Sequence, residues 1–74
     1  MNTELTRKEK EVLKLFCFDS NEIAKRQFIQ VSTVKTHANR VLEKLHCKSR
    51  AAALITAVKQ GLITIDDIEV YERK

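Results

Sequence analysis

The stretch VSTVKTHANRVLEKL, residues 31–45, has the apolar spacing of a helix and an unusual polar side. Its apolar residues recur at steps of three and four, which predicts one buried face made of Val34, Ala38, Val41, Leu42 and Leu45. The opposite side carries Thr36, Asn39, Arg40 and Glu43, flanked by Thr33 and Lys35. Glu43 is the only acid in the stretch, so this side is basic and rich in hydrogen-bonding groups.

Two shorter helices are predicted upstream of this stretch. Thr6 and Glu9 form a capping-box pattern ahead of a first helix that continues to about Cys17. Asp19 and Glu22 repeat the pattern ahead of a second, shorter helix. The connection between these two helices is very tight.

A fourth helix is predicted downstream, over RAAALITAVKQGL at residues 50–62, with Ser49 as its cap and Gly61 placed to end it. One apolar stripe on it suits a core, namely Ala53, Leu54 and Ala57. A second stripe lies about 110° away by helical geometry and consists of Ala51, Ile55, Val58 and Leu62. A surface helix of a monomer needs only one stripe, so the second predicts a dimer interface.

The composition fits one small all-helical domain. The chain has 74 residues, with no proline and a single glycine, and a chain this short buries only a modest core. We predict an all-α fold with a four-helix domain over residues 1–62 and a C-terminal tail over 63–74. In the tail, Thr64 and Asp67 could cap a short helix, or the ITI run at 63–65 could extend across the core.

Positive charge concentrates in the middle of the chain. The formal net charge is +4, yet residues 21–50 alone carry +5, from seven basic side chains against two acidic ones. Residues 62–74 carry −2. Such a segment attracts polyanions, although it also fits a soluble basic surface. Three of its lysines are candidates for phosphate contacts, each weak by itself: Lys25, Lys44 and Lys48.

Other chemistries have little support in the sequence. Cys17 and Cys47 lie in apolar surroundings, which predicts two buried free thiols and no disulfide. Cys/His pairs with zinc spacing, a nucleophile–base pair and a phosphate loop are all missing, so we expect no metal, no cofactor and no enzymatic activity. Because no apolar run approaches the ~20 residues of a membrane span and no signal peptide is recognisable, we expect a cytoplasmic protein without membrane contact.

A short helix, a tight turn and a longer helix with a basic N-terminal half predict a helix-turn-helix. The side chains suit the major groove, where Asn can bridge adenine, Lys or Arg can donate to guanine, and a Thr methyl can touch thymine. A helix N-terminus and small hydroxyl residues favour phosphate oxygens. His37 fits two interpretations equally, either a packed, hydrogen-bonded helix residue or a phosphate ligand.

Four motifs follow one another along nearly the whole chain up to about Leu62: LTRKEKEVL at 5–13, EIAKR at 22–26, TVKTHANRVLEKL at 33–45 and KSRAAA at 48–53. In this combination they resemble the LuxR-type (GerE/FixJ/NarL-like) DNA-binding domain. The resemblance implies a four-helix domain whose third helix enters the major groove. It also implies that the fourth helix pairs two subunits on a pseudo-palindromic site, which agrees with the second apolar stripe.

The resemblance also implies roles for single residues. The positions that face base edges in this family match Lys35, Thr36 and Asn39. The region that approaches the DNA backbone matches Thr33 and Arg40. Structural roles, through caps and internal ion pairs, fall to Glu9, Glu22 and Arg50.

The chain also departs from the family pattern. Gln30 stands where the third helix usually has a Ser or Thr cap, and His46 replaces a common glycine. A receiver or ligand-binding domain is not recognisable in these 74 residues. These features predict a divergent, free-standing member of the family.

Three functions compete at this point. The first is a transcription regulator that binds double-stranded DNA as a homodimer, with RNA polymerase as a further candidate partner. The second is a protein-interaction module that pairs through its fourth helix with a full-length regulator and inhibits it. The third is a promoter-element reader that resembles region four of a sigma factor. The exposed Lys35, Thr36 and Asn39 favour the first, because an inhibitor has no use for such a surface.

Overall fold

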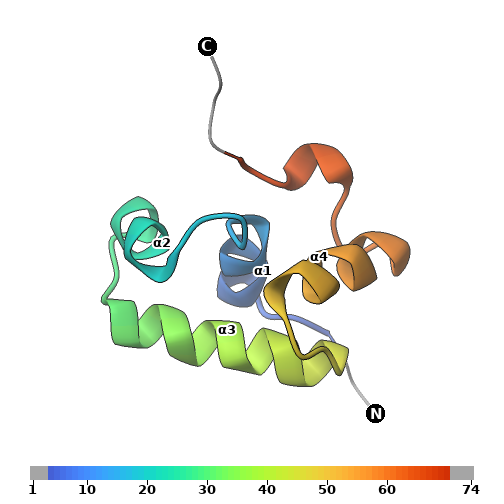
Figure 1. The fold of residues 1–74 in the computed structure, drawn as a ribbon, viewed down its shortest axis with the longest axis horizontal. Helices are drawn as coiled ribbons and strands as arrows, with labels where there is room; N and C mark the ends of the chain where they lie inside the picture. Colours follow the sequence, from blue (N-terminus) through green and yellow to red (C-terminus); the bar gives the residue numbers. More distant parts are fainter. Residues whose placement is uncertain (1–3, 71–74) are drawn as a thin grey trace.

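The computed structural model describes residues 4–70, which form four α-helices and one 3₁₀ turn (Figure 1). The helices are α1 (Arg7–Lys14), α2 (Ser20–Gln27), α3 (Val31–Leu45) and α4 (Arg50–Lys59), and the 3₁₀ turn η1 spans Ile65–Asp67. No strand occurs in this part of the chain, so the predicted all-α class with four helices is confirmed. The long helix α3 lies along one side of the molecule, and α1, α2 and α4 all pack on it (Figure 1).

The predicted buried face of α3 is confirmed. Val34, Ala38, Val41 and Leu45 are buried, and Leu42 is half-buried against the core. The remaining helices, the segment before α1, the α1–α2 connection and the tail supply the rest of the core: Leu5, Val12, Leu13, Leu15, Phe16, Phe18, Ile23, Ala24, Ala53, Ala57 and Ile63. The side opposite the buried face is exposed, as the spacing predicted, at Thr36, Asn39, Arg40 and Glu43.

The caps predicted for α1 and α2 are present, the second only in part. Glu9 N–H donates to Thr6 Oγ1 (3.1 Å), and Thr6 N–H donates to Glu9 Oε1 (3.0 Å), which completes a capping box. At α2, Glu22 N–H donates to Asp19 Oδ1 (2.8 Å). The Glu22 carboxylate does not return to the cap, because it accepts from Arg26 Nε at 2.9 Å instead.

The ends of α4 also follow the sequence, with one correction. The Ser49 hydroxyl caps the helix by accepting from Ala52 N–H (3.1 Å). The helix stops at Lys59, and Gly61 follows with a φ of +75°, which only glycine adopts without strain. Leu62 therefore lies beyond α4, and its contribution to a continuous stripe on that helix was wrongly predicted.

The predicted burial of both cysteines was wrong. Cys17 is exposed and Cys47 is half-buried, although both are free thiols, as expected. The first helix stops at Lys14 rather than near Cys17. Beyond it, Leu15 N–H and Phe16 N–H donate to carbonyls three residues back, which is a tighter winding than that of an α-helix. The side chain that follows, Cys17, is exposed to solvent.

Arg50 has a structural role, although not through an ion pair. Its guanidinium donates to the Phe18 carbonyl (3.1 Å) and to Ser20 Oγ (2.9 Å), and it lies over the Phe16 ring at 5.3 Å from the centroid. These contacts join the start of α4 to the α1–α2 connection. The expected internal ion pair of Arg50 is absent among residues 4–70.

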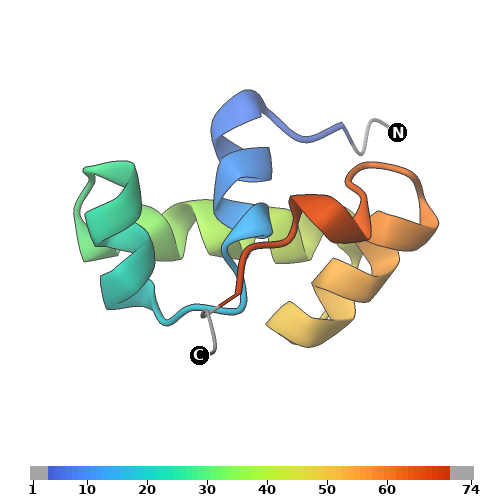
Figure 2. The same ribbon diagram turned by 90° about the horizontal axis from the view of Figure 1, so that it is seen from above.

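The tail returns across the molecule toward α1 (Figure 2). Ile63 is buried in the core, and Thr64 N–H donates to the Asp67 carboxylate at 3.0 Å. Farther on, Glu69 N–H donates to the Lys14 carbonyl at the end of α1 (3.0 Å). Of the two interpretations of the tail, the capped short helix is realised as the 3₁₀ turn η1, whereas the ITI run does not extend across the core, because Ile65 begins η1 and is 73% exposed. The predicted tail helix would also carry Ile65, Ile68 and Tyr71, and Tyr71 lies outside the described residues.

A buried ion pair joins α1 to α3. Glu9 is 2% exposed, and its carboxylate lies 2.7 Å from Lys44 Nζ, which also donates to the Glu4 carbonyl (3.2 Å). Burial raises the pKa of the Glu9 carboxyl, but the bonds from Lys44 and Thr6 outweigh it and hold the pKa below its usual value. The charged form of Glu9 is therefore the stable one in the folded protein.

Loss of the Lys44 ammonium should destabilise the fold. We expect Lys44→Met to lower the free energy of unfolding at neutral pH by about 1–3 kcal/mol, because it leaves a buried carboxylate without its charged donor. The double variant Glu9→Gln/Lys44→Met should recover part of the loss, since no charge is then stranded. Urea unfolding of the wild type, of the single variants Lys44→Met and Glu9→Gln and of the double variant measures this, and a Lys44→Met protein as stable as the wild type would contradict it.

The same pair predicts how stability depends on pH. The folded pKa of Glu9 is lowered, so its contribution is complete above the unfolded pKa and is lost as pH falls through the folded value. Glu9→Gln has no carboxylate there to protonate. Its unfolding free energy should therefore fall less than that of the wild type between about pH 6 and pH 3, the range in which carboxylates titrate.

Candidate nucleic-acid interface

The exposed face of α3 is the first feature of the candidate site. Because α1, α2 and α4 all pack on the opposite side, nothing in residues 4–70 covers Lys35, Thr36, Asn39 and Arg40 (Figure 1). These four side chains span less than two turns of a 15-residue helix, so they form one compact polar area. A rigid helix presents them, and its orientation is set by the buried apolar face.

The N-terminus of α3 borders this face and is left uncapped. Gln30 stands at the cap position with an extended backbone, but its side chain makes no capping hydrogen bond. The N–H groups of the first turn have no carbonyl partners within the helix. These free donors and the helix dipole together make this end attractive to anions.

Thr36 is held by a hydrogen bond to its own helix. Its hydroxyl donates to the Ser32 carbonyl one turn earlier, at 3.1 Å. With its proton committed, the side chain has a methyl group and oxygen lone pairs left for a ligand. Thr36 can therefore make an apolar contact through its methyl group or accept a hydrogen bond, but it has no hydroxyl proton left to donate.

Four exposed cations on α2, on α3 and in the turn before α4 have no ion-pair partners in the described part of the chain. Lys35 and Arg40 lie on α3, Lys25 lies near the end of α2, and Lys48 lies in the turn before α4. None of them belongs to a salt bridge among residues 4–70. Their charges are available to a polyanion that approaches α3.

Two residues of the predicted phosphate set are placed differently. Lys44 is engaged by Glu9 and by the Glu4 carbonyl, so it acts inside the fold. The sequence carried no signal of this pairing, because Glu9 precedes Lys44 by 35 residues. His37 is half-buried, and its Nδ1 is shielded from solvent without a hydrogen-bond partner among the described residues. A phosphate contact by His37 would have to use Nε2.

Two of the residues predicted for a dimer interface are exposed. Ala51 is exposed on α4, and Ile55 is exposed over 58% of its surface. Val58 and Leu62 are half-buried and pack partly on the core. The helix therefore presents a narrower apolar surface than its spacing suggested.

Phe28 is a surface feature that sequence reasoning missed. It lies in the turn between α2 and α3, is 93% exposed and has a φ of 57°, the left-handed region that non-glycine residues seldom occupy. Its position in the turn is seen only in the backbone conformation, because this left-handed residue ends α2.

Residues 4–70 hold no group of three His, Cys, Asp or Glu side chains that could bind a metal ion. Within the same residues, no helix is long and apolar enough to cross a membrane. The chemistry of the site thus rests on its hydrogen-bonding groups and its cations.

A short helix, a three-residue turn and a longer helix with an exposed basic face define a helix-turn-helix. The model of the family described as bacterial regulatory proteins, luxR family (GerE), matches residues 3–57. The chain belongs to this family, and its fold is the DNA-binding domain that the four sequence motifs predicted.

The chain is also similar to proteins that are named as regulators. The chain is 39% identical over 61 residues to the response regulator protein VraR of Staphylococcus aureus and, equally, to VraR of Staphylococcus saprophyticus. It is 35% identical over 60 residues to the uncharacterized transcriptional regulatory protein YxjL of Bacillus subtilis. These alignments cover 78–80% of the chain and 28–29% of the relatives. The chain thus spans less than a third of their length.

If Thr36 faces a base, as the family resemblance implies, its bonding predicts that the methyl group makes the contact. We expect Thr36→Val to keep its affinity for a selected DNA site, because the methyl group remains. Thr36→Ser should lose about 1 kcal/mol, roughly fivefold, for the missing methyl. Replacing the contacted thymine by deoxyuridine should weaken the wild type and Thr36→Val alike and leave Thr36→Ser unaffected. The reverse order in fluorescence anisotropy titrations would show that the hydroxyl makes the contact.

Proposed function

We propose that this protein is a sequence-specific transcription regulator that binds double-stranded DNA as a homodimer on a pseudo-palindromic site. The observation that carries the proposal is the uncovered face of α3, where unpaired cations and an amide lie together on a rigid helix. Membership of the luxR family supports it. With this role the protein acts in the cytoplasm, on the nucleoid, and RNA polymerase is a further candidate partner.

In this proposal α3 enters the major groove and three side chains contact bases. Lys35 donates to guanine, Asn39 bridges the hydrogen-bonding pair of adenine, and Thr36 presents its methyl to thymine. All three are exposed and lie within five residues of one another on the helix. Phosphate contacts come from Thr33, Arg40, Lys25 and Lys48, with His37 limited to its Nε2.

The competing function is a protein-interaction module that pairs with a full-length regulator through α4 and blocks it. The exposed Ile55 is compatible with either function. The uncovered face of α3 favours the DNA-binding function, because inhibition through α4 does not use it. Selection of oligonucleotides by the purified chain distinguishes the two, since an inhibitor should enrich no sequence.

The base contacts predict two loss-of-affinity variants. Lys35→Ala and Asn39→Ala should each weaken binding to the selected site by about 1–3 kcal/mol and relax the preference at one base pair. Lys14→Ala is the matched control, because this lysine lies at the end of α1 that contacts the tail and does not belong to α3. Unchanged affinity and unchanged sequence preference in both α3 variants would rule out this assignment.

The free cations predict a steep dependence on salt. Each lysine–phosphate contact releases counterions, so affinity should fall with salt concentration for every sequence. Lys25→Ala and Lys48→Ala should weaken specific and non-specific binding equally and reduce the slope of log K against log salt by at most about one unit each. Titrations at several salt concentrations measure the slope, and an interaction insensitive to salt would point to a protein partner.

A further inference from the structure

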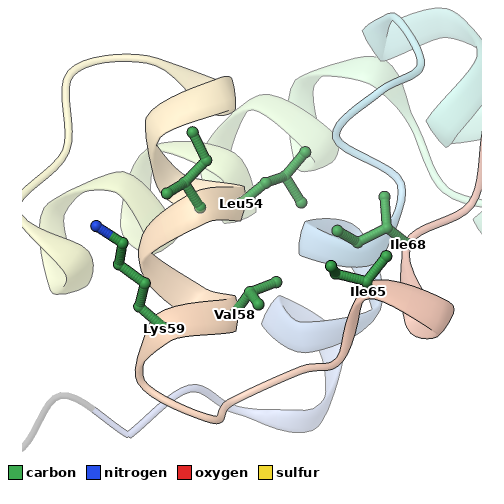
Figure 3. A pocket seen from close by; sticks show the side chains of 6 residues that line it. Leu54, Val58, Lys59, Ile65 and Ile68 are labelled. Carbon is green, nitrogen blue, oxygen red and sulfur yellow. The ribbon is translucent and has the colours of Figure 1, made fainter.

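An apolar groove of about 360 Å³ lies between α4 and the tail (Figure 3). Leu54 and Val58 point into it from α4, and Ile65 and Ile68 face them from the tail. Its full lining is Leu54, Ile55, Val58, Lys59, Ile65 and Ile68. Lys59 is the only charged residue of the lining, and its side chain points away from the groove (Figure 3).

The tail forms one wall of this groove and is fixed to the rest of the domain at both ends. Ile63 anchors its start in the core, and Ile68 is half-buried against the same core. Glu69 fixes the far end twice, by its N–H to the Lys14 carbonyl and by its carboxylate at 3.5 Å from Arg26 Nη1. The groove is thus a surface of the folded domain and does not depend on an unattached segment.

The groove is bordered by apolar side chains that remain in water. On the α4 side of the groove Ile55 is 58% exposed, and on the tail side Ile65 is 73% exposed. One face of the molecule therefore carries both a hollow and projecting apolar side chains. This combination fits a second copy of the same face, because a two-fold contact requires a surface that is complementary to itself.

The size of the surface also favours a second copy that contacts the tail. A specific interface buries at least about 500 Å² on each partner, roughly a tenth of the 5334 Å² of accessible surface here. On α4 the predicted stripe leaves only Ala51 and Ile55 exposed, along a helix of ten residues. The tail adds further apolar side chains across the groove from this stripe, at Ile65 and Ile68.

We propose that the tail forms half of the dimer interface, so that Ile55 of each subunit enters the groove between α4 and the tail of the other. This inference rests on the dimer of the proposed function and adds the segment that completes it. The interface then consists of two equivalent hollows filled by two equivalent isoleucines. Residues 63–69, beyond the 3–57 matched by the family, thereby acquire a role in assembly.

Ile65→Glu tests the proposal, with Val70→Glu as the matched control. Ile65 is 73% exposed, so the substitution should leave the fold intact, as circular dichroism and thermal unfolding can verify. Val70 is 60% exposed in the same tail but does not line the groove. Ile65→Ser, which adds no charge, replaces Ile65→Glu if the latter fails to fold.

The measurements are affinity for a full palindrome, affinity for a half-site and self-association by sedimentation equilibrium. We expect Ile65→Glu and Ile55→Glu to weaken palindrome binding at least about tenfold, because each places a charge in an apolar seam. Half-site binding should be unchanged, and Val70→Glu should match the wild type. Palindrome binding by Ile65→Glu equal to that of the wild type would overturn the proposal, whatever Ile55→Glu does.

The inference and the proposed function can fail separately. If the wild type selects no DNA sequence, the proposed function fails, and self-association at high protein concentration decides the inference. Loss of self-association in Ile65→Glu but not in Val70→Glu supports the groove as the contact. A wild type that is monomeric at every concentration and binds a palindrome without cooperativity overturns it, and the groove then suits a different partner.

Discussion

Burial of one face of α3 organises both the core and the candidate DNA surface. Each of the other three helices packs on that face, and none of them covers the opposite side of α3. Because side chains on a helix have fixed angular positions, burying Val34, Ala38 and Val41 exposes Lys35, Thr36 and Asn39 in a set orientation. The core of the domain therefore positions the surface that we propose contacts bases. A change that rotated α3 would disturb stability and DNA binding together.

The distribution of bound and free cations is the second constraint. Lys44 neutralises the buried Glu9, and Arg26 pairs with Glu22 and Glu69 while lying 4.1 Å from the centroid of the Phe18 ring. Arg50 serves the α1–α2 connection. The basic segment thus divides into cations that hold the fold and cations that stay free around α3. A count of charges along the chain overstates the surface available to DNA.

The fold also contains two residues with left-handed backbone where glycine would be less strained. Phe28 ends α2 with a φ of 57°, and His46 ends α3 with a φ of 56°. Each terminates a helix and lets the chain reverse direction within a few residues. The resulting short connections keep α2, α3 and α4 close together, and the radius of gyration of the domain is 11.6 Å. At Phe28 the same turn leaves an aromatic ring almost fully in water beside α3.

The sequence by itself determined the class, the helices and the exposed face, because these depend on local patterns. Apolar spacing of three and four marked the buried side of α3, and Thr6, Asp19 and Ser49 marked helix starts through hydrogen bonds to nearby N–H groups. Only the tertiary structure decided which charges are free and what the tail does. The pairing of Lys44 with Glu9 and the facing of Ile65 toward α4 join residues that lie far apart along the chain or across a loop. Such contacts depend on how the helices pack, and no periodicity in the sequence encodes them.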